Sequence, residues 1–163
     1  MNALESIQKI KNLSPNSIDE LLNIFPWQLF EIDFELPPDD EQETIISQNV
    51  IIGERSQVHK LILAENVTIK TDAEIHGTIV CRKIVLDENS ECNYLIAEEL
   101  IANNNAEIRF AVIQNTLRLE ADAEINEIEA CHSIEADLST EAEIKNILKI
   151  KPFFIIFTTQ NNT

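Results

Sequence analysis

Residues 73–79 read Ala-Glu-Ile-His-Gly-Thr-Ile. The first three of them are one copy of a motif that recurs along the chain: a small residue, then Glu or Gln, then an apolar residue. A repeat of about 17 residues cannot bury its own apolar face, so it must stack on its neighbours. The sequence therefore predicts a solenoid. The copies are Ser56-Gln57-Val58, Ala73-Glu74-Ile75, Ser90-Glu91-Cys92, Ala106-Glu107-Ile108, Ala123-Glu124-Ile125 and Ala142-Glu143-Ile144, at intervals of 17, 17, 16, 17 and 19 residues.

The spacing of apolar residues within each repeat predicts short strands. Pairs of apolar residues such as Val67 and Ile69 are separated by one residue, which is the alternation of a strand with one buried face. Most of these apolar residues are β-branched, as is typical of strands. The pattern favours a mainly β fold: a single-stranded parallel β-helix of about six 17-residue coils, each with about three short strands. The column expected to point inward consists of Ile45, Ile62, Ile79, Ile96, Ile113, Ala130 and Ile147, each 17 residues from the next.

The residue before each small residue predicts a corner with left-handed backbone. Asp and Asn tolerate this conformation and hydrogen-bond their own turn. They therefore take the role that glycine has in other solenoids, and this chain has only 2 glycines. The corner positions are Asp72, Asn89, Asn105 and Asp122, with Arg55 and Glu141 in the outer coils.

The two ends of the chain differ from the repeats. Residues 1–44 carry helical patterns, a helix that Pro26 ends, and an alternating strand up to Leu36, so they predict a small N-terminal cap on the open coil or a docking element for a partner. Residues 45–151 form the repeat domain, and 152–163 form an apolar tail. The tail is expected either to cap the last coil or to be an assembly edge, through Phe153, Phe154, Ile155, Ile156 and Phe157.

Composition limits the partners and the compartment. With 12 basic and 29 acidic residues, the formal net charge is −17, so nucleic acid and anionic membranes are poor direct partners and a basic protein is a better one. No signal peptide and no transmembrane run is recognisable, and 3 cysteines in no motif favour a reducing cytoplasm.

The glutamates of the motif predict one outward column along the solenoid. Such a column is either a solvated charged face or an acidic stripe that binds a basic protein surface or weakly holds divalent cations. The candidate interaction residues are Glu74, Glu91, Glu107, Glu124 and Glu143.

Residues with catalytic or metal-binding chemistry are sparse. His59 and His76 are 17 residues apart and should stack, but no cysteine shares their column. No phosphate loop, nucleophile elbow or zinc pattern occurs, and the apolar spacing does not fit the six-residue period of hexapeptide acyltransferases. We therefore predict no catalytic, cofactor-binding or metal-binding residue, no small-molecule substrate and no enzyme activity.

The repeat resembles the bactofilin domain, a polymer-forming β-helix of the bacterial cytoskeleton. The closest stretch is Ala64-Glu65-Asn66-Val67-Thr68-Ile69, followed by residues 73–79, and the resemblance covers roughly residues 45–150. Of the family's repeating glycine only Gly77 is present. The resemblance implies a right-handed triangular β-helix, no enzyme activity and a scaffold role.

Two functions follow from these observations. The first is a non-catalytic cytoplasmic scaffold that self-associates through the ends of its β-helix. The second is an acidic binding module that neutralises or recruits a basic protein, as an immunity protein or a charge mimic does.

Overall fold

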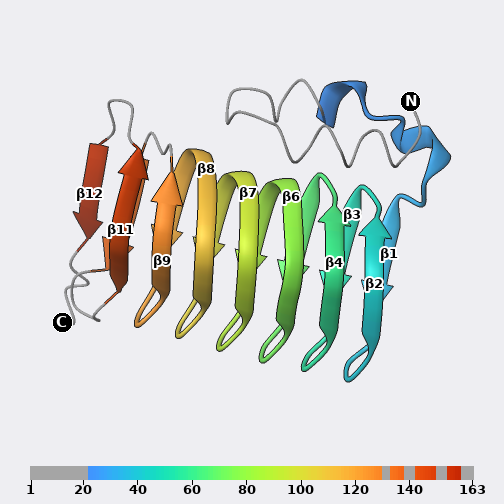
Figure 1. Ribbon diagram of the computed structural model, residues 1–163, viewed down its shortest axis with the longest axis horizontal. Coiled ribbons are helices and arrows are strands. Elements are labelled where there is room, and N and C mark those ends of the chain that lie inside the picture. Colours follow the sequence, from blue (N-terminus) through green and yellow to red (C-terminus); the bar gives the residue numbers. More distant parts are fainter. Residues whose placement is uncertain (1–21, 130–132, 138–141, 150–153, 159–163) are drawn as a thin grey trace.

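The computed structural model describes residues 22–129, 133–137, 142–149 and 154–158 (Figure 1). A short 3-10 helix, η2 (Trp27–Leu29), precedes the strands. The strands are β1 (Asp33–Leu36), β2 (Glu41–Ile46), β3 (Asn49–Ile52), β4 (Gln57–Leu63), β5 (Asn66–Ile69), β6 (Glu74–Leu86), β7 (Glu91–Ala102), β8 (Glu107–Leu119), β9 (Glu124–Glu129), β10 (Ser133–Asp137), β11 (Glu143–Lys149) and β12 (Phe154–Thr158).

The strands stack as successive coils of one parallel solenoid. All strand pairs are parallel, along the paths β1-β3-β5-β6-β7-β8-β10-β12, β2-β4-β6 and β8-β9-β11. The chain is therefore mainly β and forms a β-solenoid of about six turns, which confirms the predicted fold class. Figure 1 shows the coils in a single row from β1 and β2 to β11 and β12.

Each coil pairs with the next through three short segments. Between β6 and β7 the paired segments are 74–75, 78–81 and 83–86, and the first two are separated by a register shift. The coil of β4 and β5 has the corresponding segments 57–58, 61–63 and 66–69. This confirms the prediction of about three strands per coil, although the segments often run together as one long strand.

The core is a narrow stack of aliphatic side chains. Val67, Ile69 and Ile75, which were predicted to face inward in one coil, are all 2% exposed or less. Their partners in the neighbouring coils are buried too, because parallel pairing places equivalent residues directly above one another. The three columns are Val50, Val67, Ile84, Leu100 and Leu117; Ile52, Ile69, Leu86, Ala102 and Leu119; and Val58, Ile75, Cys92, Ile108 and Ile125.

The strict 17-residue column is wrong at Ile96 and Ile113, correct again at Ile147, and not testable at Ala130, which lies outside the described residues. Ile79 pairs with Leu95, and not with Ile96. The reason is the corner that follows the glutamate motif: it holds two residues, His76 and Gly77, in β6 but only Asn93 in β7. The inward column is therefore Ile45, Ile62, Ile79, Leu95, Ala111, Ile128 and Ile147. The residues Ile46, Leu63, Val80, Ile96 and Val112 form a separate column on the other side of the strand, and Ile113 stacks on Ala97.

The left-handed corners are confirmed. Asp72, Asn89, Asn105 and Asp122 have φ between 56° and 60°, and Arg55 has φ 57°. Neither glycine has a positive φ. Glu141 lies outside the described residues.

Gly77 allows the main chain of its coil to lie close to the main chain of the neighbouring coil. A Cβ built on Gly77 would lie 2.2 Å from the main-chain oxygen of Lys60. The two-residue corner thus brings two backbones closer together than any side chain allows.

Both predicted domain boundaries need correction. The solenoid begins at Asp33 rather than at residue 45, because β1 pairs with β3 and β2 pairs with β4 in the parallel register of the later coils. At the other end, β12 pairs with β10 and thus extends the same stack, although it belongs to the predicted tail. Phe153 lies outside the described residues.

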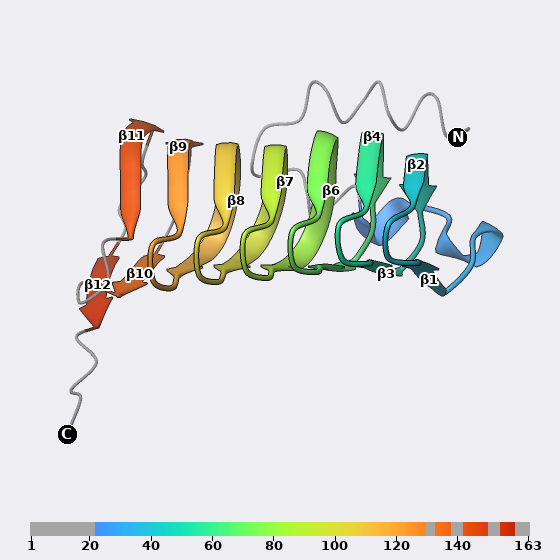
Figure 2. The same cartoon turned by 90° about the horizontal axis from the view of Figure 1, so that it is seen from below.

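The described part of the segment before β1 packs on the side of the solenoid. Leu22 and Phe25 are buried in a cluster with Leu61, Leu63 and Val80, which project outward from β4 and β6. Residues 22–24 are helical, as predicted before Pro26. The expectation of an end cap is therefore corrected for residues 22–30, which contact a flank (Figure 2).

Candidate functional site

The glutamates of the repeat form one column, which confirms their predicted alignment. Neighbouring coils place equivalent side chains about 4.8 Å apart. All its members are half-buried or exposed. We call this column the glutamate ladder: Glu41, Gln57, Glu74, Glu91, Glu107, Glu124 and Glu143.

A second column follows two residues later, at the corner of each coil. We call it the corner column: His59, His76, Asn93, Arg109, Asn126 and Lys145. It partly neutralises the ladder. His76 Nε2 lies 3.4 Å from a carboxylate oxygen of Glu74, and Lys145 Nζ donates a hydrogen bond to Glu124 that raises the pKa of Lys145.

The centre of the ladder is not neutralised in this way. Among the described residues, Glu91 and Glu107 form no ion pair. Like charges that face each other across neighbouring strands destabilise a sheet. The middle coils therefore carry the part of the ladder that has no direct ion pair within the described residues.

The predicted stacking of His59 and His76 is confirmed. Their ring centroids are 5.5 Å apart and their planes differ by 12°. His59 Nε2 lies 3.3 Å from a carboxylate oxygen of Glu41. No cluster of three or more metal-ligating side chains occurs in the described part of the chain, so the pair has no further ligands around it there.

An aromatic pair lies on the other side of the corner column. Tyr94 and Phe110 stack with centroids 4.8 Å apart and planes 13° apart. They are equivalent to Thr78 in the preceding coil and Glu127 in the following one. Tyr94 is 40% exposed, and burial together with the nearby Glu129 raises its pKa. The pair is a partly accessible flat apolar surface beside a polar corner.

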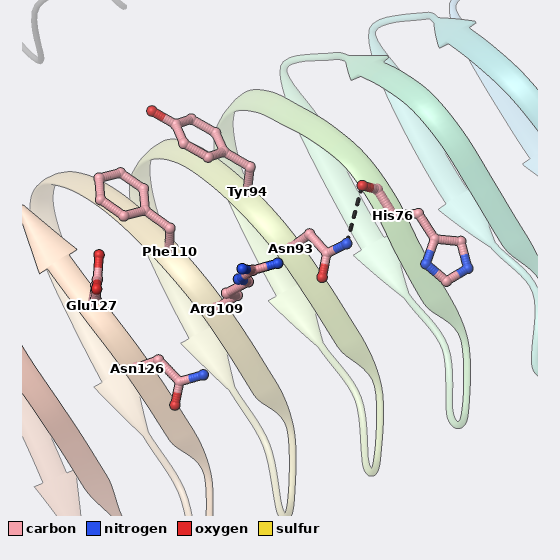
Figure 3. A pocket seen from close by; sticks show the side chains of 7 residues that line it. All are labelled: His76, Asn93, Tyr94, Arg109, Phe110, Asn126 and Glu127. Carbon is pink, nitrogen blue, oxygen red and sulfur yellow. Dashed lines mark hydrogen bonds between the residues drawn. The ribbon is translucent and has the colours of Figure 1, made fainter.

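These side chains surround an open groove of about 530 Å³ (Figure 3). Its floor is the corner column from His76 to Asn126, and Tyr94, Phe110 and Glu127 form one wall. Asn93 is held in place, because its Nδ2 donates a hydrogen bond of 3.1 Å to the main-chain oxygen of His76.

Two groups in the groove lack partners among the described residues. The Oδ1 atom of Asn126 is shielded from solvent and accepts no hydrogen bond from them. Arg109 makes no ion pair or side-chain hydrogen bond with the part of the chain that the structure describes. A shielded acceptor without a donor costs stability, and a guanidinium offers five donors. The groove therefore offers both an acceptor and donors to a ligand.

Sequence reasoning did not identify Tyr94, Arg109, Phe110 and Asn126 as a site. Each belongs to a different register from the one that the strict 17-residue column predicted. The available signal was the single 16-residue interval between Ser90 and Ala106, which marks the shortened corner.

The ends of the solenoid are a second candidate surface. Among the described strands, β1 and β2 pair only with β3 and β4, and β11 and β12 pair only with β9 and β10. Each terminal strand therefore has one edge that no described strand pairs. Ile147, the last member of the inward column, is 43% exposed. Of the predicted assembly residues, Phe154, Ile155, Ile156 and Phe157 lie in β12.

The two described cysteines lie where their thiols are poor nucleophiles. Cys81 and Cys92 are buried, and burial raises the pKa of both, that of Cys92 to about 12. A thiol with such a pKa is almost entirely protonated at neutral pH and is a poor nucleophile. Cys131 lies outside the described residues.

Comparisons with protein-family models, with curated proteins and with solved structures find no match to this chain. The resemblance to bactofilins accordingly stays a prediction. In the described residues, no helix has the length and apolar character needed to cross a membrane.

Proposed function

We propose that this protein is a non-catalytic scaffold of the cytoplasm that self-associates through the ends of its β-solenoid, as the bactofilin-like repeat suggests. The observation that carries the proposal is the one-sided pairing of β1 and β2 at one end and of β11 and β12 at the other. An unpaired parallel edge presents main-chain N–H and C=O groups in register for another strand.

The apolar interior supports the same proposal. Ile147 continues a column of buried aliphatic side chains, yet 43% of its surface is exposed. A further coil stacked on β11 would bury it in the way that Ile128, which is 1% exposed, is already buried. The described N-terminal segment lies on a flank, so it does not stand in the way of stacking at the C-terminal end.

Charge sets the conditions for assembly. At −17 per chain, subunits repel one another, and salt screens this repulsion because the Debye length falls from about 10 Å at 0.1 M to about 3 Å at 1 M. Assembly through the ends should therefore increase with ionic strength.

The test is molecular mass by light scattering coupled to size exclusion, at low and high salt. We expect large, salt-promoted species for the natural chain, and smaller species for Ile147→Lys and for a chain without residues 152–163. Ile51→Lys is the matched control, because Ile51 is also partly exposed (37%) but faces away from the core in β3. A monomer under every condition would refute self-association.

A second candidate function is supported by the glutamate ladder. We propose that the protein is alternatively a binding module for a basic protein, as immunity proteins and charge mimics are. The ladder is in register, and Glu91 and Glu107 lack ion-pair partners among the described residues. A complementary charge pattern on a partner speeds association and gives specificity. Recovery of no basic protein by the immobilised chain at low salt would count against it.

A further inference from the structure

Three parallel stripes of different chemistry run side by side at the groove. Tyr94 and Phe110 line the groove itself, and Glu91 and Glu107 line an adjoining hollow. The corner column runs between the two, because Asn93, Arg109 and Asn126 border both hollows. All three stripes cross the same middle coils, and Figure 3 shows the groove side chains projecting from successive coils. A ligand that lies along the corner would contact all three stripes at once.

The central stripe has groups that fit a polypeptide main chain. Arg109 has donors without a partner in the described part of the chain, and Asn126 Oδ1 is an acceptor without one. They are one coil apart, about 4.8 Å. In an extended peptide, the C=O and N–H of one residue point to the same side of the chain, as the paired residues of a sheet do. Arg109 can thus donate to the C=O, and Asn126 can accept from the N–H of the same residue.

The outer stripes select the side chains of such a peptide. When one edge of an extended chain faces the corner column, its side chains alternate between the two flanks. One set then points to Glu91 and Glu107, which favour Lys or Arg, and the other set points to Tyr94 and Phe110, which favour apolar or aromatic groups. The expected sequence alternates basic and apolar residues.

We propose that the groove binds an extended peptide segment of a basic protein, with its main chain on Arg109 and Asn126 and its basic side chains on the glutamate ladder. The proposal rests on the second candidate function and names the partner class and the site. It does not depend on assembly through the ends.

The probe is a fluorescein-labelled peptide of about seven residues that alternates arginine and leucine, long enough to cross the middle coils at about 3.3 Å per residue. Its control has the same composition, with the arginines and leucines in two blocks. Binding is measured by fluorescence anisotropy at low salt. We expect the alternating peptide to bind more tightly than the block peptide. Equal binding, or no binding of the alternating peptide at about 1 mM, would overturn the proposal.

Arg109→Ala distinguishes main-chain recognition from simple charge attraction. Removing a positive charge should strengthen the binding of a basic peptide if charge alone acts. If Arg109 bonds the main chain, the same change should weaken binding by about tenfold. Arg118→Ala is the matched control, since Arg118 lies on another face and pairs with Glu120. Tighter binding to the Arg109 variant would refute the proposed geometry.

The ladder is tested with Glu91→Gln and Glu107→Gln together, compared with Glu88→Gln and Glu99→Gln. Both pairs change the net charge equally, and Glu88 and Glu99 are exposed away from the groove. We expect about tenfold weaker binding for the first pair and little change for the second. Equal effects would mean diffuse attraction to an acidic protein and would overturn the site.

The same samples separate this proposal from end-to-end assembly. Ile147→Lys should reduce the assembled mass and leave peptide binding unchanged, because the groove lies in the middle coils. Arg109→Ala should weaken peptide binding and leave the assembled mass unchanged. Failure of one proposal would thus leave the measurement of the other intact.

Discussion

The glutamate ladder predicts that removing a charge stabilises this protein. Glu91 lies between Glu74 and Glu107, with one coil spacing of about 4.8 Å to each. Two unit charges at that distance repel by about 0.9 kcal/mol in water, and screening at 0.15 M salt reduces this to about 0.5 kcal/mol. Glu91→Gln relieves two such repulsions, so it should stabilise the fold by about 1 kcal/mol.

The assay is equilibrium urea unfolding at about 0.15 M and about 1 M salt. With a typical slope of roughly 2 kcal/mol/M, Glu91→Gln should raise the urea midpoint by about 0.5 M at low salt. The reverse change, Gln57→Glu, places a charge between Glu41 and Glu74 and should lower the midpoint by a similar amount.

Glu88→Gln is the control for this prediction. Glu88 is exposed at another corner, where the equivalent residues of the adjoining coils, Thr71 and Asn104, are uncharged, so the midpoint should hardly move. Salt must also matter, because the Debye length of about 3 Å at 1 M removes most of the repulsion. A midpoint that falls in Glu91→Gln at low salt, or a gain that persists unchanged at 1 M, would refute the electrostatic reasoning.

Three further predictions concern the core and its corners. Gly77→Ala should destabilise the chain by about 1–3 kcal/mol in urea, since its Cβ would lie 2.2 Å from the Lys60 oxygen, and a neutral result would mean that the two coils separate freely. Leu95→Ala should cost about 2–5 kcal/mol because Leu95 is fully buried, and an effect below about 1 kcal/mol would contradict the shifted register. The raised pKa of Cys92, about 12 against 9.0 in the unfolded chain, means that the unfolded state loses its proton first as pH rises. The free energy of unfolding should therefore fall between about pH 9 and pH 12. Cys92→Ala should reduce this pH dependence, measured by urea unfolding at several pH values. If the free energy of unfolding of the variant varies with pH as steeply as that of the natural chain, the burial of the thiol is contradicted.

Much of the architecture was predictable because it depends on the conformational preferences of single residues and on a short motif that recurs in the sequence. The left-handed corners at Asp72 and Asn89 follow from the conformational freedom of Asp and Asn, and the ladder follows from the recurrence of glutamate beside a small residue. The groove was not predictable in the same way. Its residues come from coils that are distant in sequence, and their alignment depends on how many residues each corner holds.

By itself, the sequence determined that this chain is a parallel β-solenoid, where its corners turn and that its glutamates form a column, because these properties depend on a repeat and on single-residue preferences. Only the tertiary structure decided that Leu95 faces the core, that the stack begins at Asp33, and that Tyr94 and Phe110 meet. Leu95 and Ile96 are both apolar, so the alternation is ambiguous there. A shift of one residue moves every following side chain to the opposite face, and pairing with the neighbouring coils selects the register that fills the core.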